Sequence, residues 1–377
     1  MSTLKVNTIQ DTTGNDAISI GSDGSAGFVQ TQMSHRNLII NGAMQVAQRG
    51  TSAFTPSAQT YTLDRWFAIS DPGSKFTVQQ NAGSVTPPVG FSKYLGVTST
   101  SAYTLSANNY NILDYRFEGQ DTVSFAWGTS NAKDITVSFW VRSSLTGQFS
   151  FIVYNAASGG TKRYAATYTV SSANTWEYKT VTIPGDTTES WGSDNGYGMI
   201  LRFNLGTGST YGSATANAWQ TGTQFGTSGD NSIVSTNGAT WYITGVQLEV
   251  GSVATPFEHR SYGEELARCQ RYYQQWGGNA SYERVTVGFY HTTSQVRLCV
   301  PLHPEMRTAP SLSVSAHSDW LLETQGTSNS NTNHTLDSAS PKVASINVTT
   351  TLTSTAGYCG QLLANGIDAR LKLDAEL

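Results

Sequence analysis

Apolar and polar residues alternate in short stretches along most of the chain. Two stretches, residues 134–144 and 147–155, place an apolar side chain at every second position: Ile135, Val137, Phe139, Val141, Phe149, Phe151 and Val153. Alternation with a period of two predicts a β-strand that buries one face. Several such stretches, separated by polar loops, lie between residues 36 and 258. We therefore expect residues 36–258 to form a β-sandwich.

The strand pattern resumes in residues 277–377. The segments SYERVTVGFY and TSQVRLCVPL are predicted to pair as a hairpin, with HTTS as its loop. Residues 319–338 are dominated by Ser, Thr and Asn, so we expect a long exposed loop there. Alternation returns near the C-terminus and predicts a final strand with one buried face, carried by Ile367, Ala369, Leu371 and Leu373. Residues 277–377 are thus predicted to be a smaller C-terminal β domain.

Residues 259–276 have a helical rather than a strand pattern. Ser261 and Glu264 have the spacing of a capping box, in which the hydroxyl and the carboxylate satisfy each other's free backbone N–H groups. Apolar residues then recur at helical spacing, at Leu266, Cys269 and Tyr273. We predict a helix over residues 261–276 that joins the two β domains.

Residues 1–35 are a poor candidate for an independent domain. Two alternating pairs, Leu4 with Val6 and Ile18 with Ile20, are separated by turn-forming residues. This predicts a small strand–turn–strand unit with too little apolar surface to fold alone. It is either a flexible tail or, in our preferred interpretation, an anchor that orders against a larger assembly.

Composition supports an all-β chain and narrows its partners. Charged residues make up 13% of the sequence, about half of the usual share of roughly 25%, and neutral polar residues replace them. Aromatic residues make up 11%, which argues against disorder. The net charge of -4 argues against nucleic acid, which needs clustered Lys and Arg. A neutral polar surface suits hydroxyl-rich partners such as glycans.

The three cysteines, Cys269, Cys299 and Cys359, lie far apart and form no CxxC spacing, so we expect neither a zinc site nor a disulfide framework. We interpret them as buried free thiols of a protein made in a reducing cytoplasm. The N-terminus lacks the features of a signal peptide. Since no run of about 18 apolar residues occurs, we expect no membrane insertion.

Several phrases resemble those of bacteriophage tail-fibre and receptor-binding proteins. The longest is VQLEVGSVATPFEHRSYGEELARCQRYY, and RNLIINGAMQVAQRGT with YTLDRW is similar to the start of the same module. VSFWVRSSLTG and WEYKTVTIPGDT are similar to carbohydrate-binding jelly rolls, and MRTAPSLSVS is similar to the strand that follows the helix in such fibres. The opening LKVNTIQDTTGN resembles the N-termini of fibre proteins of marine phages, particularly those of cyanobacteria.

The resemblance implies a virion fibre that is made in the host cytoplasm and meets the host surface as a homotrimer. Residues 1–35, with Leu4, Val6 and Ile9, would attach it to another tail or virion protein, and residues 36–258 would form a carbohydrate-binding-like jelly roll. Three stretches match nothing in the family and are expected to carry specificity: residues 81–115, 186–240 and 320–340.

Aromatic residues in Gly-rich loops are the candidates for glycan contact, because sugar C–H faces stack on aromatic rings. They are Trp191, Tyr197, Tyr211, Trp219 and, in the segment 317–335, Trp320. The alternatives are that the first four anchor loops or make trimer contacts, and that Trp320 is an apolar plug beneath its loop.

The junction helix carries a wide aromatic surface. An isolated helix of about four turns is marginal in water, so a threefold bundle of these helices would bury that surface. On this hypothesis Leu266, Tyr273 and Trp276 lie at the oligomer interface. The alternative is that the helix docks onto the sandwich of its own chain.

We expect a binding protein rather than an enzyme, since no GxSxG, HExxH or P-loop motif occurs. A structural virion component without receptor binding and a polysaccharide-degrading tailspike stay open as alternatives. Carbohydrate-binding jelly rolls often hold a structural calcium ion, for which Asp186, Asp194 and Glu249 offer oxygen atoms. Their spacing is not that of a known calcium loop, so we assign no metal ligand and no cofactor.

Overall fold

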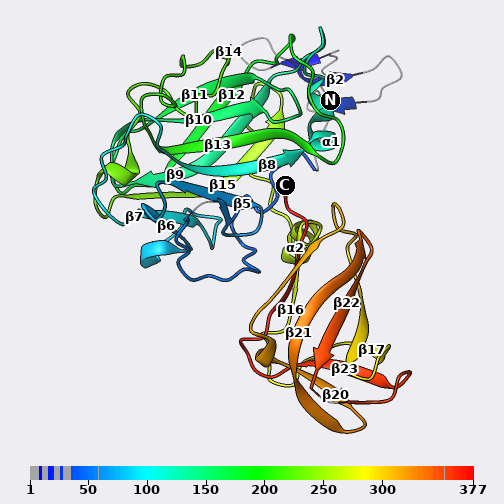
Figure 1. Ribbon diagram of the computed structural model, residues 1–377. Helices are drawn as coiled ribbons and strands as arrows, with labels where there is room; N and C mark the ends of the chain where they lie inside the picture. Colours follow the sequence, from blue (N-terminus) through cyan, green and yellow to red (C-terminus); the bar gives the residue numbers. More distant parts are fainter. Residues whose placement is uncertain (1–7, 11–15, 21–25, 29–34, 58, 352) are drawn as a thin grey trace, which may run out of the picture.

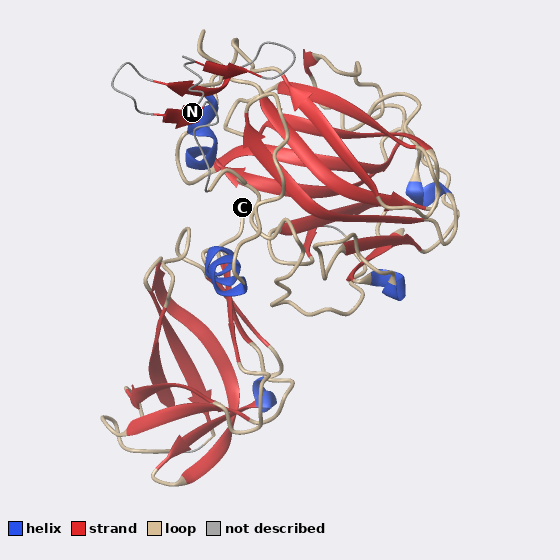
Figure 2. Ribbon diagram, turned by 180° about the vertical axis from the view of Figure 1, so that it is seen from behind, coloured by secondary structure: helices blue, strands red, loops and turns tan. Residues whose placement is uncertain are grey.

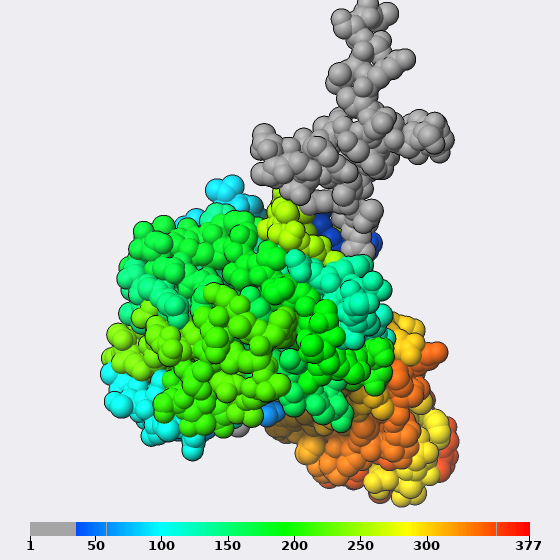
Figure 3. Space-filling view, turned by 90° about the horizontal axis from the view of Figure 1, so that it is seen from above, coloured from blue at the N-terminus to red at the C-terminus, as the bar shows by residue number. Residues whose placement is uncertain are grey.

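The computed structural model describes residues 8–10, 16–20, 26–28, 35–57, 59–351 and 353–377. Two β domains with a short helix between them make up most of it (Figure 1). The predicted all-β class is confirmed. In the space-filling view, the orange and yellow surface of the C-terminal domain emerges beyond one edge of the cyan and green sandwich (Figure 3).

Three short strands near the N-terminus form an antiparallel sheet: β1 (Thr8–Gln10), β2 (Asp16–Ile20) and β3 (Ala26–Phe28). Ile9 lies in β1, opposite Ile18 of β2. Leu4 and Val6 lie outside the described residues. Strands in this segment are thus present, and their attachment to a virion stays a prediction.

The sandwich contains a seven-stranded and a five-stranded antiparallel sheet (Figure 2). In spatial order the larger sheet consists of β14 (Trp219–Thr221), β11 (Lys162–Val170), β10 (Gly147–Asn155), β13 (Tyr197–Thr207), β8 (Tyr110–Glu118), β5 (Trp66–Asp71) and β4 (Gln59–Tyr61). The smaller sheet consists of β12 (Glu177–Ile183), β9 (Ile135–Ser143), β15 (Thr240–Val250), β7 (Leu95–Ser99) and β6 (Phe76–Gln80). Short helical turns interrupt the loops: η1 (Ala82–Ser84), α1 (Gly119–Thr122), η2 (Val123–Phe125) and η3 (Ile233–Ser235).

The core of the sandwich lies between these two sheets. The alternating residues predicted to be buried in β9 and β10 all have 0% exposure: Ile135, Val137, Phe139, Val141, Phe149, Phe151 and Val153. Phe139 and Phe151 meet edge to face across the sheets, with ring centroids 6.0 Å apart. The two strands and the buried face predicted for each are therefore confirmed, and several residues of the alternate face, among them Ser138, Ser150 and Ile152, are buried as well.

The C-terminal domain is a closed barrel with a small sheet beside the junction. In spatial order the barrel consists of β17 (Arg284–Tyr290), β18 (Gln295–Pro301), β22 (Val343–Thr350), β21 (Thr327–Ser340), β20 (Trp320–Thr324) and β23 (Cys359–Ala364). The small sheet consists of β16 (Tyr273–Trp276), β24 (Leu371–Asp374) and β19 (Ser311–Val314), and η4 (His317–Asp319) precedes β20. The predicted β17–β18 hairpin is confirmed.

The long exposed loop predicted for residues 319–338 is wrong. The segment is the hairpin of β20 and β21, which turns at Gln325 and Gly326, both with positive φ. Asn is depleted in strands, but pairing with β22 along most of β21 satisfies the backbone. The polar side chains of β21 lie mainly on the exposed side, which explains their composition.

The predicted helix begins correctly but ends early. The helix α2 (Tyr262–Gln270) has Ser261 as its N-cap, whose hydroxyl accepts a hydrogen bond from the Glu264 N–H at 3.3 Å. Residues 273–276 instead form β16, which pairs with β24 near the C-terminus. Pairing with a strand nearly 100 residues away outweighs the local helical spacing of residues 273–276. The local sequence pattern gives no sign of that distant partner.

The two domains are fastened together at the end of α2. Arg271 donates two hydrogen bonds to the buried carboxylate of Glu118 in β8, at 2.7 and 2.8 Å, and the Tyr272 hydroxyl donates a third at 2.6 Å. The C-terminal tail returns to this junction, where the C label lies in Figure 1. There Glu376 pairs with the fully buried Arg65 of the sandwich.

This docking changes the interpretation of the junction aromatics. Tyr273 is 3% exposed within a single chain, and the Arg49 guanidinium lies 3.8 Å from its ring centroid. Trp276 packs against the barrel core, and Leu266 is half-buried. The argument that one chain leaves this aromatic surface uncovered is therefore wrong. The homotrimer itself stays a prediction from the resemblance.

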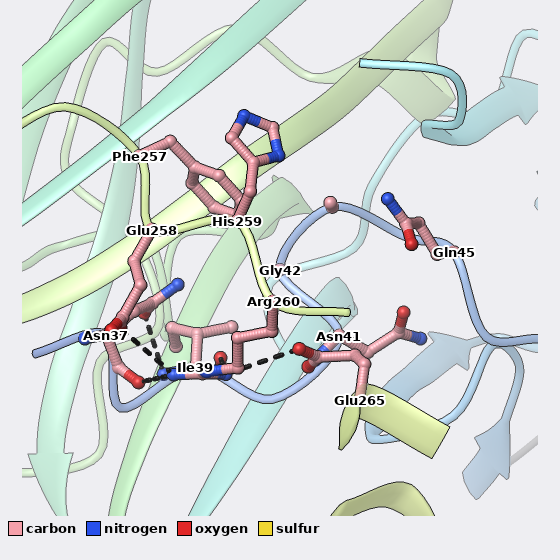
Figure 4. A pocket seen from close by; sticks show the side chains of 11 residues that line it. Asn37, Ile39, Asn41, Gly42, Gln45, Phe257, Glu258, His259, Arg260 and Glu265 are labelled. Atoms are coloured by element: carbon pink, nitrogen blue, oxygen red, sulfur yellow. Dashed lines mark hydrogen bonds and ion pairs between the residues drawn. The ribbon is translucent and has the colours of Figure 1, made fainter. Parts of the chain in front are cut away.

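The segment before the sandwich is held by the linker that precedes α2 (Figure 4). Arg260 donates to the backbone carbonyls of Asn37 and Ile39 and pairs with Glu265 at 3.4 Å. The cavity among these residues is about 10 Å³, which is about the room for one water molecule. This cavity is too small for a ligand larger than water.

Candidate functional site

An open cleft of about 420 Å³ lies on the outer face of the seven-stranded sheet. Strands β8, β10, β11 and β13 form its floor, because their inward residues fill the core and their alternate residues point away from it. The residues that line it are Gln59, Ile69, Tyr110, Arg116, Tyr154, Asn155, Ala156, Ala157, Gly160, Arg163, Tyr197, Ile200, Arg202 and Phe225.

Strand register places one row of these residues straight across the sheet. Arg163 of β11 is paired with Tyr154 of β10, which is paired with Ile200 of β13. Ile200 is in turn paired with Arg116 of β8. Since adjacent strands are about 4.8 Å apart, the row is about 14 Å long. It has a guanidinium at each end and a tyrosine ring in between.

Aromatic rings form the side of the cleft away from the junction. Phe225 stacks on Tyr211, with centroids 4.6 Å apart and an interplanar angle of 6°, and Tyr110 meets Phe225 edge to face at 5.2 Å. Tyr197, at the opposite side, is 42% exposed. Its hydroxyl accepts a hydrogen bond from Arg116 at 3.2 Å. The cleft therefore offers ring surfaces on both sides.

Arg202 lies in the floor of the cleft, and its charge is neutralised by Asp114. It is 5% exposed and binds Asp114 through two hydrogen bonds of 2.8 and 2.7 Å. Burial acts to lower the pKa of Arg202, but the facing Asp114 carboxylate outweighs it and raises that pKa. The guanidinium also lies 4.2 Å from the Phe225 ring centroid and 5.0 Å from that of Tyr154, which holds both rings in place.

Arg116 closes the end of the cleft nearest the junction. Besides bonding to Tyr197, it donates to the backbone oxygen of Leu377 in the C-terminal tail. The Tyr61 hydroxyl donates to the same oxygen. The tail of the C-terminal domain thus contributes to one end of the cleft.

Chemically, the cleft suits a ligand with both apolar and hydroxyl-bearing faces. Tyrosine and phenylalanine rings supply flat apolar surfaces. Gln59, Asn155 and the arginines supply amide and guanidinium groups for hydrogen bonds. Of the described residues, none that lines the cleft is Asp or Glu.

Of the five predicted glycan-contact residues, two belong to the cleft, two lie outside it in the sandwich, and Trp320 lies in the barrel. Tyr197 lines the cleft, and Tyr211 supports Phe225 from behind. Trp191 and Trp219 lie outside it, in a cluster with Trp127 at centroid distances of 4.6 and 5.3 Å. Trp191 donates its indole N–H to Asp186 of the same loop, and Trp219, at the start of β14, donates to the Pro184 carbonyl of that loop. They anchor loops, which was the alternative interpretation.

The prediction that Trp320 contacts a receptor is wrong. Trp320 begins β20 and has 0% exposure in the barrel core, so it is the apolar plug of the alternative. A hollow of about 490 Å³ does lie at an end of the barrel, lined by Thr293, Thr324, Gln325, Thr327, Thr353, Ser354, Thr355 and Tyr358. It has a single ring and no charged group, so the sandwich cleft is the stronger candidate site.

The three side chains that offer oxygen atoms for calcium each accept hydrogen bonds from residues nearby in the chain, Asp194 from the Gly196 N–H. Asp186 accepts from Thr188 and Trp191, and Glu249 accepts from Thr255. No group of three or more His, Cys, Asp or Glu side chains is placed to hold a metal ion in the described part of the chain. All three cysteines are free, but Cys299 and Cys359 are exposed, so only Cys269 is a buried thiol as predicted.

Sequence reasoning missed most of the cleft. Tyr154 falls on the polar phase of the strand predicted over residues 147–155, so its outward direction was available from alternation. Arg163 and Arg202 carried no such signal, since a basic residue on a strand is ordinarily a surface residue, and Phe225 lies in the loop between β14 and η3. Only the register brings them together.

Comparisons with known proteins give structural similarity only. A scan of protein-family models finds no match to the chain, and a search of curated proteins finds none either. Among solved structures, the enzymatically active domain of tailspike protein 4 of bacteriophage CBA120 is similar over 57% of this chain, with 12% identity and a TM-score of 0.30. This chain covers 21% of that tailspike chain.

Two carbohydrate-binding modules are similar over almost their whole length. The family 11 module of a Clostridium thermocellum cellulosomal cellulase has 14% identity and a TM-score of 0.27, over 56% of this chain and 98% of the module. A family 61 module in complex with β-1,4-galactotriose has 10% identity and a TM-score of 0.28, over 57% of this chain and 99% of the module. Similarity at this level does not establish a function for this chain.

No helix among the described residues is long and apolar enough to cross a membrane.

Proposed function

We propose that this chain is a bacteriophage fibre protein whose sandwich domain binds a glycan or lipopolysaccharide of the host cell surface. The observation that carries the proposal is the cleft on the seven-stranded sheet. It combines rings on both sides with a row that has a guanidinium at each end and with the nearby amides of Gln59 and Asn155. Sugars present the same two kinds of surface, apolar C–H faces and hydroxyl edges.

The virion setting rests on the resemblance of the sequence to phage fibres. In this proposal residues 1–35, with their three short strands, attach the fibre to another virion protein. The fibre would be a homotrimer located in the virion. Three weak sites that engage together compound their affinities, because the second and third binding events are intramolecular.

Binding is a better proposal than cleavage. Hydrolysis of a glycosidic bond ordinarily requires two carboxyl groups that flank the bond. The Asp114 carboxylate beneath the cleft floor is buried and held by the bidentate pair with Arg202, and that of Glu189 accepts hydrogen bonds from Asn155, Thr161 and Lys162. We therefore propose that a bound glycan leaves the cleft unchanged.

The test is a binding titration of the purified full chain with oligosaccharides released from the surface polysaccharide of a susceptible host. Tyr197→Ala and Phe225→Ala should each weaken binding roughly 5- to 10-fold, since each loss of a ring contact costs about 1 kcal/mol. Tyr178→Ala is the matched control, because Tyr178 is 43% exposed on the other sheet. Equal affinity in all three variants, or no binding by the unaltered chain, would overturn the proposal.

The virion part of the proposal needs its own measurement. Added fibre protein should compete with the phage for host cells, and an antibody against the sandwich should label the tails of intact particles. Labelling of the capsid, with no effect on adsorption, would support the alternative of a structural virion component.

A further inference from the structure

The guanidinium groups of the cleft are unequally satisfied. Arg202 has the bidentate Asp114 carboxylate, and Arg116 has the oxygens of Tyr197 and Leu377. Among the described residues, Arg163, at the opposite end of the row from Arg116, has neither a carboxylate nor a second oxygen as a hydrogen-bond partner.

The only hydrogen bond of the Arg163 side chain among the described residues runs from Nε to the Gly222 carbonyl. Its Nη1 atom is buried without a partner. The two Nη atoms form the fork with which arginine binds a carboxylate or a phosphate. In this chain Arg163 lines the cleft, and neither Nη atom has a hydrogen-bond acceptor among the described residues.

The surroundings hold Arg163 in this position. Its guanidinium carbon lies 4.4 Å from the Tyr154 ring centroid and 5.6 Å from that of Phe225. The carbonyl of Gly222 fixes the Nε side. Burial lowers the pKa of Arg163 and the neighbouring Arg202 acts in the same direction, while Tyr154 and Glu189 partly oppose them. An anion that entered the cleft would reverse this penalty.

From this geometry we propose that the cleft selects saccharides that carry an anionic substituent, and that the Arg163 fork binds the anion while Tyr154 and Phe225 contact the sugar rings. The inference rests on the proposed function and specifies its ligand. Carboxylate, sulfate and phosphate groups share the required chemistry, and a planar fork binds each of them through two parallel N–H donors.

The experiment compares charged oligosaccharides with neutral ones of the same backbone. The probes are oligogalacturonate against its carboxyl-reduced form, and sulfated or phosphorylated dextran oligosaccharides against plain dextran. The full chain should bind at least one charged member roughly tenfold more tightly than its neutral counterpart, since hydrogen bonds to charged groups contribute more than neutral ones. The preference should shrink as salt is raised from about 0.05 to 0.5 M. Which charged member prevails distinguishes the three anions.

Arg163→Gln should abolish the preference and leave the affinity for the neutral member within about twofold. Arg163→Lys keeps the positive charge but lacks the fork, so this variant should retain only part of the preference for the charged member. Arg142→Gln is the matched control, because Arg142 is also a half-buried strand arginine beside a tyrosine ring, 5.5 Å from the Tyr242 centroid on the other sheet.

Three outcomes separate the inference from the proposed function. Equal affinity for charged and neutral members in the unaltered chain overturns the inference and leaves glycan binding intact, whether or not any variant folds. A charge preference that persists in Arg163→Gln overturns the role of Arg163. Failure of every oligosaccharide to bind, together with failure of host polysaccharide, overturns the proposed function itself.

Discussion

We expect the contact between the two domains to be most sensitive to substitution at Glu118. Its carboxylate has 0% side-chain exposure and accepts two hydrogen bonds from Arg271 and one from Tyr272. Glu118→Gln preserves the shape of the side chain but removes its charge. The Gln amide nitrogen is a donor, and the groups of Arg271 and Tyr272 that face it are donors too, so they cannot bond to it. The variant should therefore loosen the contact between the barrel and the sandwich.

The magnitude follows from burial. Removing one partner of a buried ion pair costs about 3–5 kcal/mol. The Arg271 side chain is 32% exposed and regains some hydration in the variant, which places the expected loss at the lower end, about 3 kcal/mol. For a domain of roughly 150–250 residues, the size class of the sandwich, that corresponds to a fall of roughly 6–12 °C in the melting temperature.

Scanning calorimetry of the full chain measures this effect. The transitions of the two domains should move apart as well as down, because their coupling is lost. Glu264→Gln is the control: it makes the same substitution in the exposed pair with Arg268, where the side chains are 43% and 31% exposed, and should change stability by no more than about 0.5 kcal/mol. A Glu118→Gln melt that matches the Glu264→Gln melt would refute the reasoning.

Two further predictions concern the barrel. Burial, together with the nearby charge of His317, lowers the pKa of His334 to about 4, against about 6.5 in the unfolded chain. The unfolded chain therefore takes up the proton first, so stability from this group is complete above pH 6.5 and declines as the pH falls towards 4. Urea unfolding between pH 4 and 7 should show this slope reduced in His334→Leu and unchanged in His303→Gln. Trp320→Ala should destabilise the barrel by about 3–5 kcal/mol without changing glycan affinity in the cleft, whereas Tyr282→Ala, at a ring 61% exposed, should have little effect; weakened glycan binding by folded Trp320→Ala would instead favour a receptor role.

The elements with a clear local pattern could be predicted from the sequence. Strands β9 and β10 bury the residues that their alternation specifies, and the N-cap of α2 is Ser261. The last strand behaves similarly: Ala369, Leu371 and Leu373 have 0% exposure, while Ile367 before the strand is 62% exposed and departs from the prediction. Local alternation works here because one face of each strand meets a continuous core.

Predictions failed where a distant partner decides the conformation. Tyr273 and Trp276 fit a helix locally, yet they form a strand because β24 pairs with them. Trp320 sits next to a polar segment, yet it is buried because β20 pairs with β23 in the closed barrel, with Trp320 opposite Ala364. Neither partner is adjacent in the sequence, so no local pattern records the contact.

The sequence by itself determined the all-β class, the division into two β domains and the start of the helix between them, because periodicity and capping are properties of neighbouring residues. Its aromatic and neutral polar composition also led to the prediction of a hydroxyl-rich partner that contacts aromatic rings. Only the tertiary structure decided where that chemistry lies. The row from Arg163 through Tyr154 and Ile200 to Arg116 exists because strand register aligns residues that chain order separates. The tail that ends at Leu377 borders that row because the C-terminal domain folds back on the sandwich.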